Sequence, residues 1–281
     1  MSRLFSIIVV TFNSQKYIKS CLDSIYAQDV VNPEIIVVDN GSRDKTCDIV
    51  HDLYPHVILI QNTYNMGACK ARNQGIEKAG GEWILTLDCD VTLGKGFLAT
   101  ILEYAEALGH ESVVLQPKIM RADGKRIFSC GIRRLPFGRF TDIGKGMKDK
   151  KTFNSPEEIF GACCAAALYK RAILEKTKET TGYFDERLFF LFEDVDVAWR
   201  IWNAGGKTVF IPSARCYHLG NSSQCDFFIR QYLCWRNRKF ILKKQDYFNF
   251  LAVCFYDFPR FLWLKIINSR FRSHNISDII Q

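Results

Sequence analysis

The first 90 residues alternate short apolar runs with helix-like segments, and this pattern constrains the fold more than any other feature of the chain. Four runs rich in β-branched residues have the character of buried strands: 6–12, 34–42, 57–62 and 82–90. Three segments between them place apolar residues at helical spacing: 14–28, with Ser14 as the expected N-cap, 44–53 and 68–79. Alternation of this kind predicts βαβ units and a mostly parallel sheet flanked by helices.

Polar side chains follow the predicted strands at the points where the strands end. They are Asn13, Asp39, Asn40, Asn65, Asp88 and Asp90. Ligands of parallel sheets bind beyond the carboxyl ends of the strands. We therefore expect these side chains to cluster in space around a bound ligand.

The second half of the chain is less regular. We expect strands at three further apolar runs: 113–120, 160–171 and 208–212, the last shortly before His218. Residues 121–157 hold turn residues and many basic side chains, which predicts a loop over the site. A helix that begins near Glu193 should stop at Gly205 and Gly206, because glycine commonly ends helices.

The net charge of +8 is concentrated in residues 222–281, which carry ten Lys or Arg residues against four Asp residues. The same segment carries fourteen of the 38 aromatic residues, and its charges leave no apolar stretch long enough to span a bilayer. A basic and aromatic amphipathic segment is typical of chains that lie on an anionic membrane surface. A helical subdomain packed on the core also explains the composition, and the sequence leaves both readings open.

The eleven cysteines form no CxxC pair and no zinc-type spacing with histidine. The N-terminal sequence lacks the length and the cleavage site of a signal peptide, so we expect reduced thiols and a cytoplasmic protein. A length of 281 residues suits one large domain, or one domain with an appendage.

Several short motifs have both a chemical and a plain structural interpretation. Asp88 and Asp90 form a hard-oxygen pair suited to Mg²⁺ or Mn²⁺ on a diphosphate, or belong to a solvated turn. Asp39 can accept a hydrogen bond from a pyrimidine N–H, or cap the turn that follows it. Arg72 can meet phosphate charge or lie on a helix surface, and His218 is either a ligand or a structural histidine. A diphosphate-bound ion with a nearby base explains these residues together, because they follow successive strands.

Residues 189–200 read FFLFEDVDVAWR, so four large apolar residues precede Glu193, Asp194 and Asp196. An acidic first turn is common in helices, and the helix dipole should favour the ionised form of Asp194. Asp196 and Arg200 are four residues apart and should pair on the helix, which predicts a structural role for Asp196. The remaining two acids are candidates for chemistry.

Six motifs in this order resemble those of the family 2 inverting glycosyltransferases: SIIVVTFNS, VVDNGSRDKT, NMGACKARNQGI, LDCD, GYFDERLFFLFEDVDVAWR and the late His218. The resemblance covers about residues 5–220 and is to the rhamnosyltransferase-like branch of bacterial surface-polysaccharide synthesis. It implies the GT-A fold, an α/β architecture with a Rossmann-like, mostly parallel central sheet flanked by helices. It also implies a glycosyltransferase domain at 1–221, with a nucleotide-sugar part at about 1–110 and an acceptor part at about 111–221. For residues 222–281 the basic and aromatic composition predicts a C-terminal amphipathic helical appendage that associates with a membrane or with the acceptor.

The resemblance implies roles for individual positions. The donor nucleotide sugar would be contacted by Thr11, Asn13, Asp39 (which matches the acid that reads the uracil or thymine ring), Asn65, Arg72 and Asp88. Mn²⁺ or Mg²⁺ would be bound by Asp88 and Asp90, with His218 as a further ligand. Asp194 matches the general base, and Glu193 would orient the acceptor.

The implied activity is a single displacement with inversion, in which an acceptor hydroxyl attacks the anomeric carbon of a UDP- or dTDP-sugar. The expected acceptor is a glycan, in particular a lipid-linked oligosaccharide of a cell-surface polysaccharide. Residues 222–281 would dock on the anionic inner face of the cell membrane, which makes the protein cytoplasmic and peripheral. No nucleic-acid partner is expected.

Other functions compete with this reading. A nucleotidyltransferase of similar fold would usually carry a Gly-rich, basic loop after the first strand, where this chain has TFNSQKY. A non-catalytic module that binds membranes or nucleic acid through the tail leaves the acidic motifs and His218 unexplained. A dinucleotide-dependent oxidoreductase is disfavoured, because no GxGxxG follows the first strand.

Overall fold

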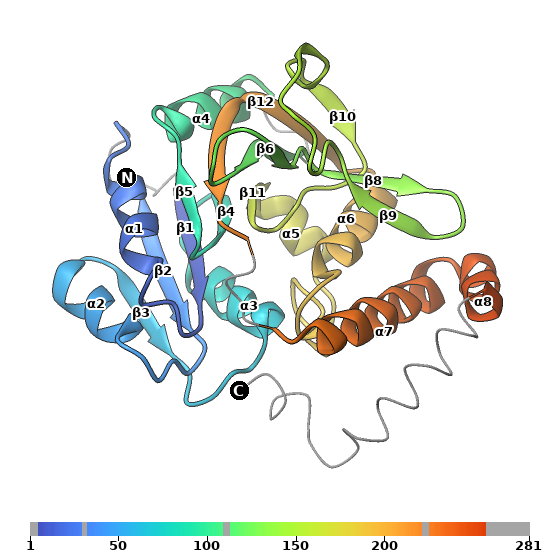
Figure 1. The fold of residues 1–281 in the computed structure, drawn as a ribbon, viewed down its shortest axis with the longest axis horizontal. Coiled ribbons are helices and arrows are strands. Elements are labelled where there is room, and N and C mark those ends of the chain that lie inside the picture. The colour runs from blue at the N-terminus through green and yellow to red at the C-terminus, as the bar shows by residue number, and fades with distance from the viewer. Residues whose placement is uncertain (1–4, 30–32, 109–112, 221–224, 257–281) are drawn as a thin grey trace.

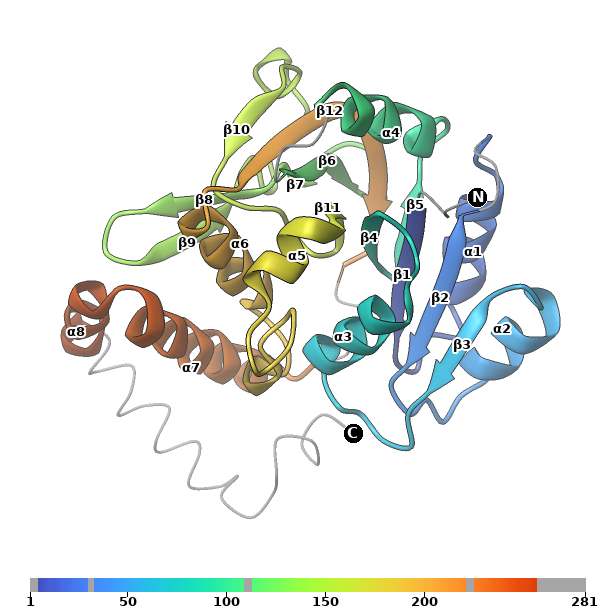
Figure 2. The same ribbon diagram turned by 180° about the vertical axis from the view of Figure 1, so that it is seen from behind.

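The computed structural model describes residues 5–29, 33–108, 113–220 and 225–256. Over these ranges the protein is built around one large sheet with helices on both faces (Figures 1 and 2). The mostly parallel central sheet expected from the sequence is confirmed.

The N-terminal half forms as the alternation predicts. Four parallel strands are connected by three helices: β1 (Phe5–Thr11), α1 (Ile18–Tyr26), β2 (Glu34–Asp39), α2 (Thr46–Leu53), β3 (Ile58–Gln61), α3 (Ala68–Lys78) and β4 (Trp83–Asp88). Strand β1 lies between β4 and β2, and β3 follows β2. The register places Thr11 beside Asp39 and Val10 beside Asp88, so the polar strand ends meet at one edge of the sheet.

The second half continues the same sheet with strands of both directions. Its main elements are β5 (Val91–Leu93), α4 (Phe97–Ala107), β6 (Val113–Arg121), β11 (Ala166–Lys170), α5 (Arg171–Thr177), α6 (Glu193–Asn203) and β12 (Lys207–His218). Strand β11 runs antiparallel between β4 and β6, whereas β6 and β12 are parallel. Pairing of β5 with β12 brings the ends of β4 and β12 close together, because β5 follows β4 after one short turn.

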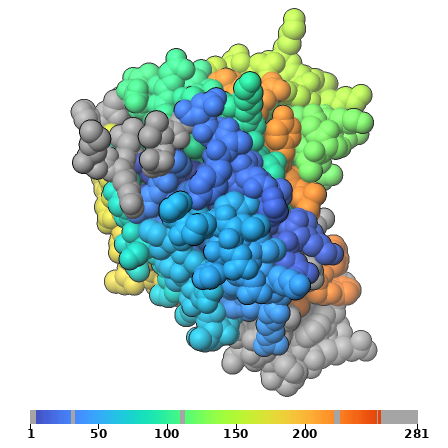
Figure 3. All heavy atoms as spheres, turned by 90° about the vertical axis from the view of Figure 1, so that its left-hand side faces the viewer, coloured from blue at the N-terminus to red at the C-terminus, as the bar shows by residue number. Residues whose placement is uncertain are grey.

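Each face of the sheet has its own apolar cluster. Alternate side chains of a strand point to opposite faces, so Ile7 and Val9 of β1 join the cluster under α1 and α4 while Ile8 joins the cluster under α3, α5 and α6. Figure 3 shows the molecule from the side of α1 and α2, which cover the N-terminal edge of the sheet. The two layers of helices hold the polar strand ends in a fixed arrangement.

The loop expected at 121–157 is more ordered than its sequence suggests. It contains three short strands and a turn of 3₁₀ helix: β7 (Ile127–Ser129), β8 (Ile132–Leu135), β9 (Arg139–Asp142) and Lys151–Phe153, and β10 (Glu157–Ile159) follows directly. Strands β8 and β9 form a separate hairpin, while β7 and β10 extend the main sheet. The segment does border the site, as predicted, because Phe128, Asp142 and Lys145 line the cavity described below. Its short strands were not predicted, because strands of three or four residues are too short for their alternation to stand out.

Two further boundaries differ from the sequence reading. Ser14 is not the N-cap of α1, which begins at Ile18; its backbone carbonyl instead accepts hydrogen bonds from the N–H groups of Tyr17 and Ile18. The strand predicted at 208–212 continues to His218 through an irregularity between Ile211 and Arg215. Pro212 lies in that interval and lacks the N–H that a regular ladder requires.

The C-terminal helix α7 (Phe227–Gln245) lies against α6 and the segment that precedes α6, and α8 (Tyr247–Tyr256) follows at the outer end of α7 (Figures 1 and 2). Ile241 and Leu242 of α7 are fully buried in the apolar cluster that also contains α6. Over residues 225–256 the expectation of a helical subdomain packed on the core is confirmed, and the rest of the predicted appendage, 221–224 and 257–281, lies outside the described residues. Within the described ranges, no helix combines the length and the apolar character needed to cross a membrane.

Candidate active site

A cavity of about 560 Å³ opens where β1, β4 and β12 end. Its wall includes nine of the residues singled out from the sequence: Thr11, Asn40, Asn65, Arg72, Asp88, Asp90, Glu193, Asp194 and His218. They come from both halves of the chain: from the ends of strands β1, β2, β4 and β12, and from helices α3 and α6 on one face of the sheet. The expectation that polar strand ends cluster is therefore confirmed for most of them.

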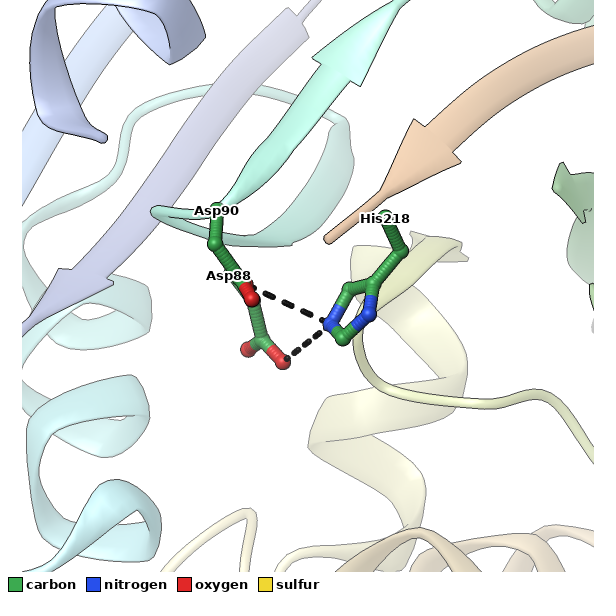
Figure 4. Close-up of side chains that lie close together, drawn as sticks. All are labelled: Asp88, Asp90 and His218. Carbon is green, nitrogen blue, oxygen red and sulfur yellow. Dashed lines mark ion pairs between the residues drawn. The ribbon is translucent and has the colours of Figure 1, made fainter. Parts of the chain in front are cut away.

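Asp88, Asp90 and His218 form a compact group with metal-ligand character (Figure 4). The imidazole Nε2 of His218 lies 3.3 Å from Asp90 Oδ1 and 3.7 Å from Asp88 Oδ2, and one ligand atom of each residue lies within 4.8 Å of the others. His218 Nδ1 is buried and has no hydrogen-bond partner among the described residues. Two carboxylates and an imidazole that converge in this way fit Mn²⁺ or Mg²⁺.

The charges of this group shift its pKa values. Burial lowers the pKa of His218, but the hydrogen bond to Asp88 and the negative charges of Asp90 and Asp88 outweigh it and raise the pKa above its ordinary value. Burial raises the pKa of Asp88, yet His218 and Arg72 hold it below its ordinary value. The group therefore concentrates negative charge, which a divalent cation would neutralise.

Arg72 joins this group to the acidic motif of α6. Its guanidinium is 4% exposed, and it donates from Nη2 to Asp88 Oδ1 at 2.8 Å and from Nη1 to Glu193 Oε1 at 2.7 Å. The second oxygen of Glu193, Oε2, is buried without a hydrogen-bond partner among the described residues. The sequence predicted that Arg72 lies on a helix and could meet negative charge. It did not predict that Arg72 would bridge Asp88 and Glu193, which are 105 positions apart.

Asp194 is half-buried in the first turn of α6, and its carboxylate faces the cavity. Burial, with the negative charges of Glu193 and Asp142, raises the pKa of Asp194 to about 8. The helix dipole was expected to favour the ionised form of Asp194, but the raised pKa shows that the protonated form is favoured overall. A dipole contributes about 0.3–1 kcal/mol, which is less than the opposing effects of burial and neighbouring charge.

The segment before α6 has an uncommon backbone. Phe189, Leu191 and Phe192 have φ values of 65°, 70° and 67°, in the left-handed region that non-glycine residues rarely adopt. Each such residue costs about 1–3 kcal/mol, and such strain often lies at functional sites. Gly67, at the start of α3, makes room for this segment, because a Cβ there would lie 2.6 Å from the carbonyl oxygen of Phe189.

Comparison with known proteins identifies the family. Residues 6–178 match the family model described as glycosyl transferase family 2. The chain belongs to this family.

Two relatives and one solved structure illustrate the similarity. The glycosyltransferase is 31% identical over 224 residues to a succinoglycan biosynthesis protein of Rhizobium meliloti, covering 77% of this chain but only 61% of that relative. It is 24% identical over 240 residues to N-acetylglucosaminyl-diphospho-decaprenol L-rhamnosyltransferase of Mycobacterium tuberculosis, covering 78% and 76% of the two chains. Its structure is similar to that of GalNAc-T7 with UDP, GalNAc and Mn²⁺, with a TM-score of 0.61, 17% identity, and coverage of 76% and 43%. The GT-A fold expected from the sequence is confirmed.

Two of the predicted nucleotide-sugar residues of the glycosyltransferase, Asn13 and Asp39, lie beside the cavity rather than in its wall. The Asp39 carboxylate accepts hydrogen bonds from the N–H groups of Gly41 and Ser42 and from the Ser42 hydroxyl. The Asn13 side chain accepts from the Arg43 N–H at 2.9 Å. Both therefore shape the turn at residues 40–43 that borders the cavity, and their contact with a nucleotide stays a prediction.

Some features of the site had no counterpart in the sequence reading. Cys225, just before α7, and Arg230 and Cys234, in its first turns, line the cavity of the glycosyltransferase although the sequence placed them in an appendage. The sequence did not indicate that one basic residue of the tail, Arg230, lies in the cavity wall.

Asp196 does pair with Arg200 at 2.9 Å, as predicted, and both are buried.

Proposed function

We propose that this glycosyltransferase moves a sugar from a UDP- or dTDP-sugar to an acceptor hydroxyl by a single displacement with inversion. One observation carries the proposal. A metal-type group of Asp88, Asp90 and His218 and an acid with a raised pKa, Asp194, line the same cavity. Arg72 bonds to Asp88 of this group and to Glu193, the residue before Asp194. Relatives named for succinoglycan biosynthesis and for rhamnosyl transfer support a glycan product.

The donor would occupy the part of the cavity near β1. Thr11 and Asn65 lie in this wall and would contact the nucleotide, while Asn13 and Asp39 support the adjoining turn, where Asp39 would meet the pyrimidine ring. Mn²⁺ or Mg²⁺ held by Asp88, Asp90 and His218 would offset the charge that develops on the leaving diphosphate. GalNAc-T7 was crystallised with UDP and Mn²⁺, which supports this choice of ligands.

Asp194 would accept the proton of the attacking hydroxyl. A base works best when its pKa lies near the working pH, and a value of about 8 allows Asp194 to exist as the carboxylate while still binding a proton readily. Glu193 is fixed by Arg72 through one oxygen and would orient the acceptor with the other. Phe190 and Phe192 add an apolar wall that would limit the access of water to the reacting bond.

The acceptor would be a glycan, in particular a lipid-linked oligosaccharide of a cell-surface polysaccharide. The relative from Mycobacterium tuberculosis is named for a diphospho-decaprenol acceptor. Within the proposed division, residues 1–110 bind the donor, 111–221 form the acceptor side, and 222–281 bring the protein to the membrane. The first turns of α7 would also border the acceptor, because they line the cavity.

The anionic inner face of the cell membrane would be contacted through α8, which makes the protein cytoplasmic and peripheral. Tyr247, Phe248 and Leu251 of α8 are exposed, and Lys243 lies exposed at the end of α7 next to them. Apolar side chains beside a basic residue suit an interface between lipid tails and anionic headgroups.

The first test is a calorimetric titration of the protein with UDP, dTDP, GDP and ADP, each with and without Mn²⁺. Metal-dependent binding of UDP or dTDP that is lost in Asp90→Ala supports the donor site. Asp194→Asn should then retain nucleotide binding and lose transfer, since an amide cannot accept the proton. Transfer at the wild-type rate in Asp194→Asn, or no nucleotide binding under any condition, would contradict the proposal.

A further inference from the structure

The position of Asp194 depends on the four residues before α6. Phe189, Leu191 and Phe192 adopt left-handed backbone conformations, and Glu193 and Asp194 follow at once as the first residues of the helix. A change of φ at any of these residues would redirect the helix start. The surrounding structure must therefore hold this segment in a conformation that its own side chains disfavour.

Asn237 of α7 contacts the backbone of this segment directly. Its side chain is fully buried, and its amide nitrogen Nδ2 lies 3.0 Å from the carbonyl oxygen of Leu188, 2.9 Å from that of Phe190 and 2.7 Å from that of Leu191. Carbonyl groups in a left-handed turn lack regular partners, and buried carbonyls without partners are costly. The two hydrogens of the Asn237 amide can donate to two of these carbonyl groups at a time, from a separate helix. The Leu188 carbonyl also accepts from the N–H of Phe190.

Arg236 determines which way the Asn237 amide faces. Its Nε donates to Asn237 Oδ1 at 2.8 Å, and its Nη2 donates to the carbonyl oxygens of Arg187 and Leu188 at 3.0 and 2.9 Å. A guanidinium has only donors, so the amide oxygen must face Arg236 and the NH₂ group must face the segment. The two neighbouring residues act as one unit on the carbonyl groups of Arg187, Leu188, Phe190 and Leu191.

We propose that the Arg236–Asn237 pair of α7 is a positioning element that holds residues 188–192, three of which have positive φ, in their observed conformation and thereby places Asp194 in the cavity. The inference rests on the proposed role of Asp194 as the base. It assigns α7 to the catalytic machinery, whereas the sequence assigned the helix to membrane or acceptor association. Neither residue is a catalytic residue, because both act through the backbone of the segment.

The test uses the full chain with two substitutions at Asn237 and one matched control. Asn237→Asp keeps the shape of the side chain but replaces the NH₂ donor with an acceptor oxygen. Asn237→Ser shortens the side chain so that it no longer reaches the carbonyl groups, and it adds no charge. The second variant is included because the buried carboxylate of the first could prevent folding. Asn203→Ser is the control, because Asn203 also donates across to α7, to Gln245 at 3.0 Å, but at the exposed far end of α6. Hydrogen exchange of the amides of residues 188–195, nucleotide binding by calorimetry, and kcat and KM are measured for each.

In the Asn237 variants we expect amide exchange of residues 188–195 to rise at least tenfold and kcat to fall at least 30-fold. Nucleotide affinity should stay within twofold, and the acidic limb of the pH profile should move to lower pH, because Asp194 becomes better hydrated. Asn203→Ser should change none of these. A merely structural role would lower the amount of folded protein but would not separate kcat from nucleotide affinity or move the pH profile.

Two outcomes would overturn the inference. One is unchanged exchange of residues 188–195 in both Asn237 variants, and the other is faster exchange with unchanged kcat. If the wild-type protein transfers no sugar, the proposed function fails, and the exchange measurement still decides whether the pair holds the segment.

Discussion

The guanidinium of Arg72 and the carboxylate of Glu193 form a buried ion pair at 2.7 Å that joins α3 to α6. The same guanidinium bonds to Asp88, at the end of β4. One side chain therefore joins the proposed metal group to Glu193, the residue directly before the proposed base Asp194. Displacement reactions depend on such fixed geometry, because the acceptor and the leaving group must lie on opposite sides of the anomeric carbon.

Arg72→Met should be strongly destabilising and nearly inactive. The substitution leaves Glu193 and Asp88 without their common cation, and removing one partner from a buried ion pair costs about 3–5 kcal/mol. Transfer should fall by about two orders of magnitude, the usual size of a lost charged contact at a reacting centre. Denaturant unfolding and initial rates measure the two effects.

The control for this substitution is Lys70→Met on the same helix. Lys70 pairs with Glu186 at 3.1 Å, but about a third of each side chain is exposed to solvent. An exposed pair of this kind contributes less than about 1 kcal/mol, so stability and transfer should change little. Similar losses in both variants would show that Arg72 has no special place in the site.

The raised pKa of Asp194 predicts the pH dependence of transfer. As a base it acts only when ionised, so kcat/KM should rise with pH and level off above about 8. The rate at pH 6 should be roughly 100-fold below the plateau. Asp142→Asn removes one of the charges that raise this pKa and should move the limb to lower pH. A flat profile between pH 6 and pH 9 would exclude Asp194 as the base.

The same shift has a consequence for stability. The folded protein holds a proton on Asp194 over a pH range, from 3.8 to about 8, in which the unfolded chain has lost it. Stability from this group therefore falls as pH rises through that range, by up to about 1.4 kcal/mol per pH unit. Asp194→Asn removes this dependence, so its gain in unfolding free energy over the wild type should be larger at pH 8 than at pH 5. An equal difference at both pH values would mean that the carboxylate is ionised throughout.

Much of the fold, and most of the site, could be predicted from the sequence because local patterns report burial. The strands before Asn13, Asn40 and Asp88 are short apolar runs, and parallel strands bring their ends together by topology alone. The bridge from Arg72 to Glu193 and the bonds from Asn237 depend on the docking of helices far apart in the sequence. No local pattern encodes such contacts.

Local propensity also misjudged the ionisation of Asp194, and composition did not show which residues of α7 are buried. The first turn of a helix favours a carboxylate, but the surrounding burial and the charge of Glu193 follow from tertiary packing. Likewise, the basic and aromatic composition of α7 gave no indication that Asn237 is fully buried against the segment before α6. The composition of a segment does not show which of its residues are buried, and the structure is needed to identify them.

His218→Ala should weaken Mn²⁺ binding tenfold or more, since it removes one of three converging ligand groups. The measurement is calorimetric titration with Mn²⁺ in the presence of saturating UDP, so it does not depend on turnover. His51→Ala is the control, because His51 pairs with Asp52 on an exposed part of the surface. Equal Mn²⁺ affinity in the wild type and His218→Ala would remove His218 from the metal site.

The exposed apolar residues of α8 should govern binding to anionic vesicles. Phe248 is 81% exposed and Leu251 is 52% exposed, and burying such side chains contributes about 1.5–3 kcal/mol each. Phe248→Ser combined with Leu251→Ser should lower partition onto vesicles that contain anionic lipid at least tenfold. Leu53→Ser is the matched control, since Leu53 is also 52% exposed but lies on α2, at the opposite end of the molecule (Figure 1).

Salt separates the electrostatic part of this binding from the apolar part. Partition through Lys243 and its basic neighbours should weaken as ionic strength rises, because exposed charges are screened within about 10 Å at 0.1 M salt. The loss caused by the two Ser substitutions should persist at high salt, because apolar burial is not screened. Equal partition of Leu53→Ser and the double variant would show that α8 is not the contact surface. The remaining role of α7 would then be at the active site, through its contacts with the segment that precedes Asp194.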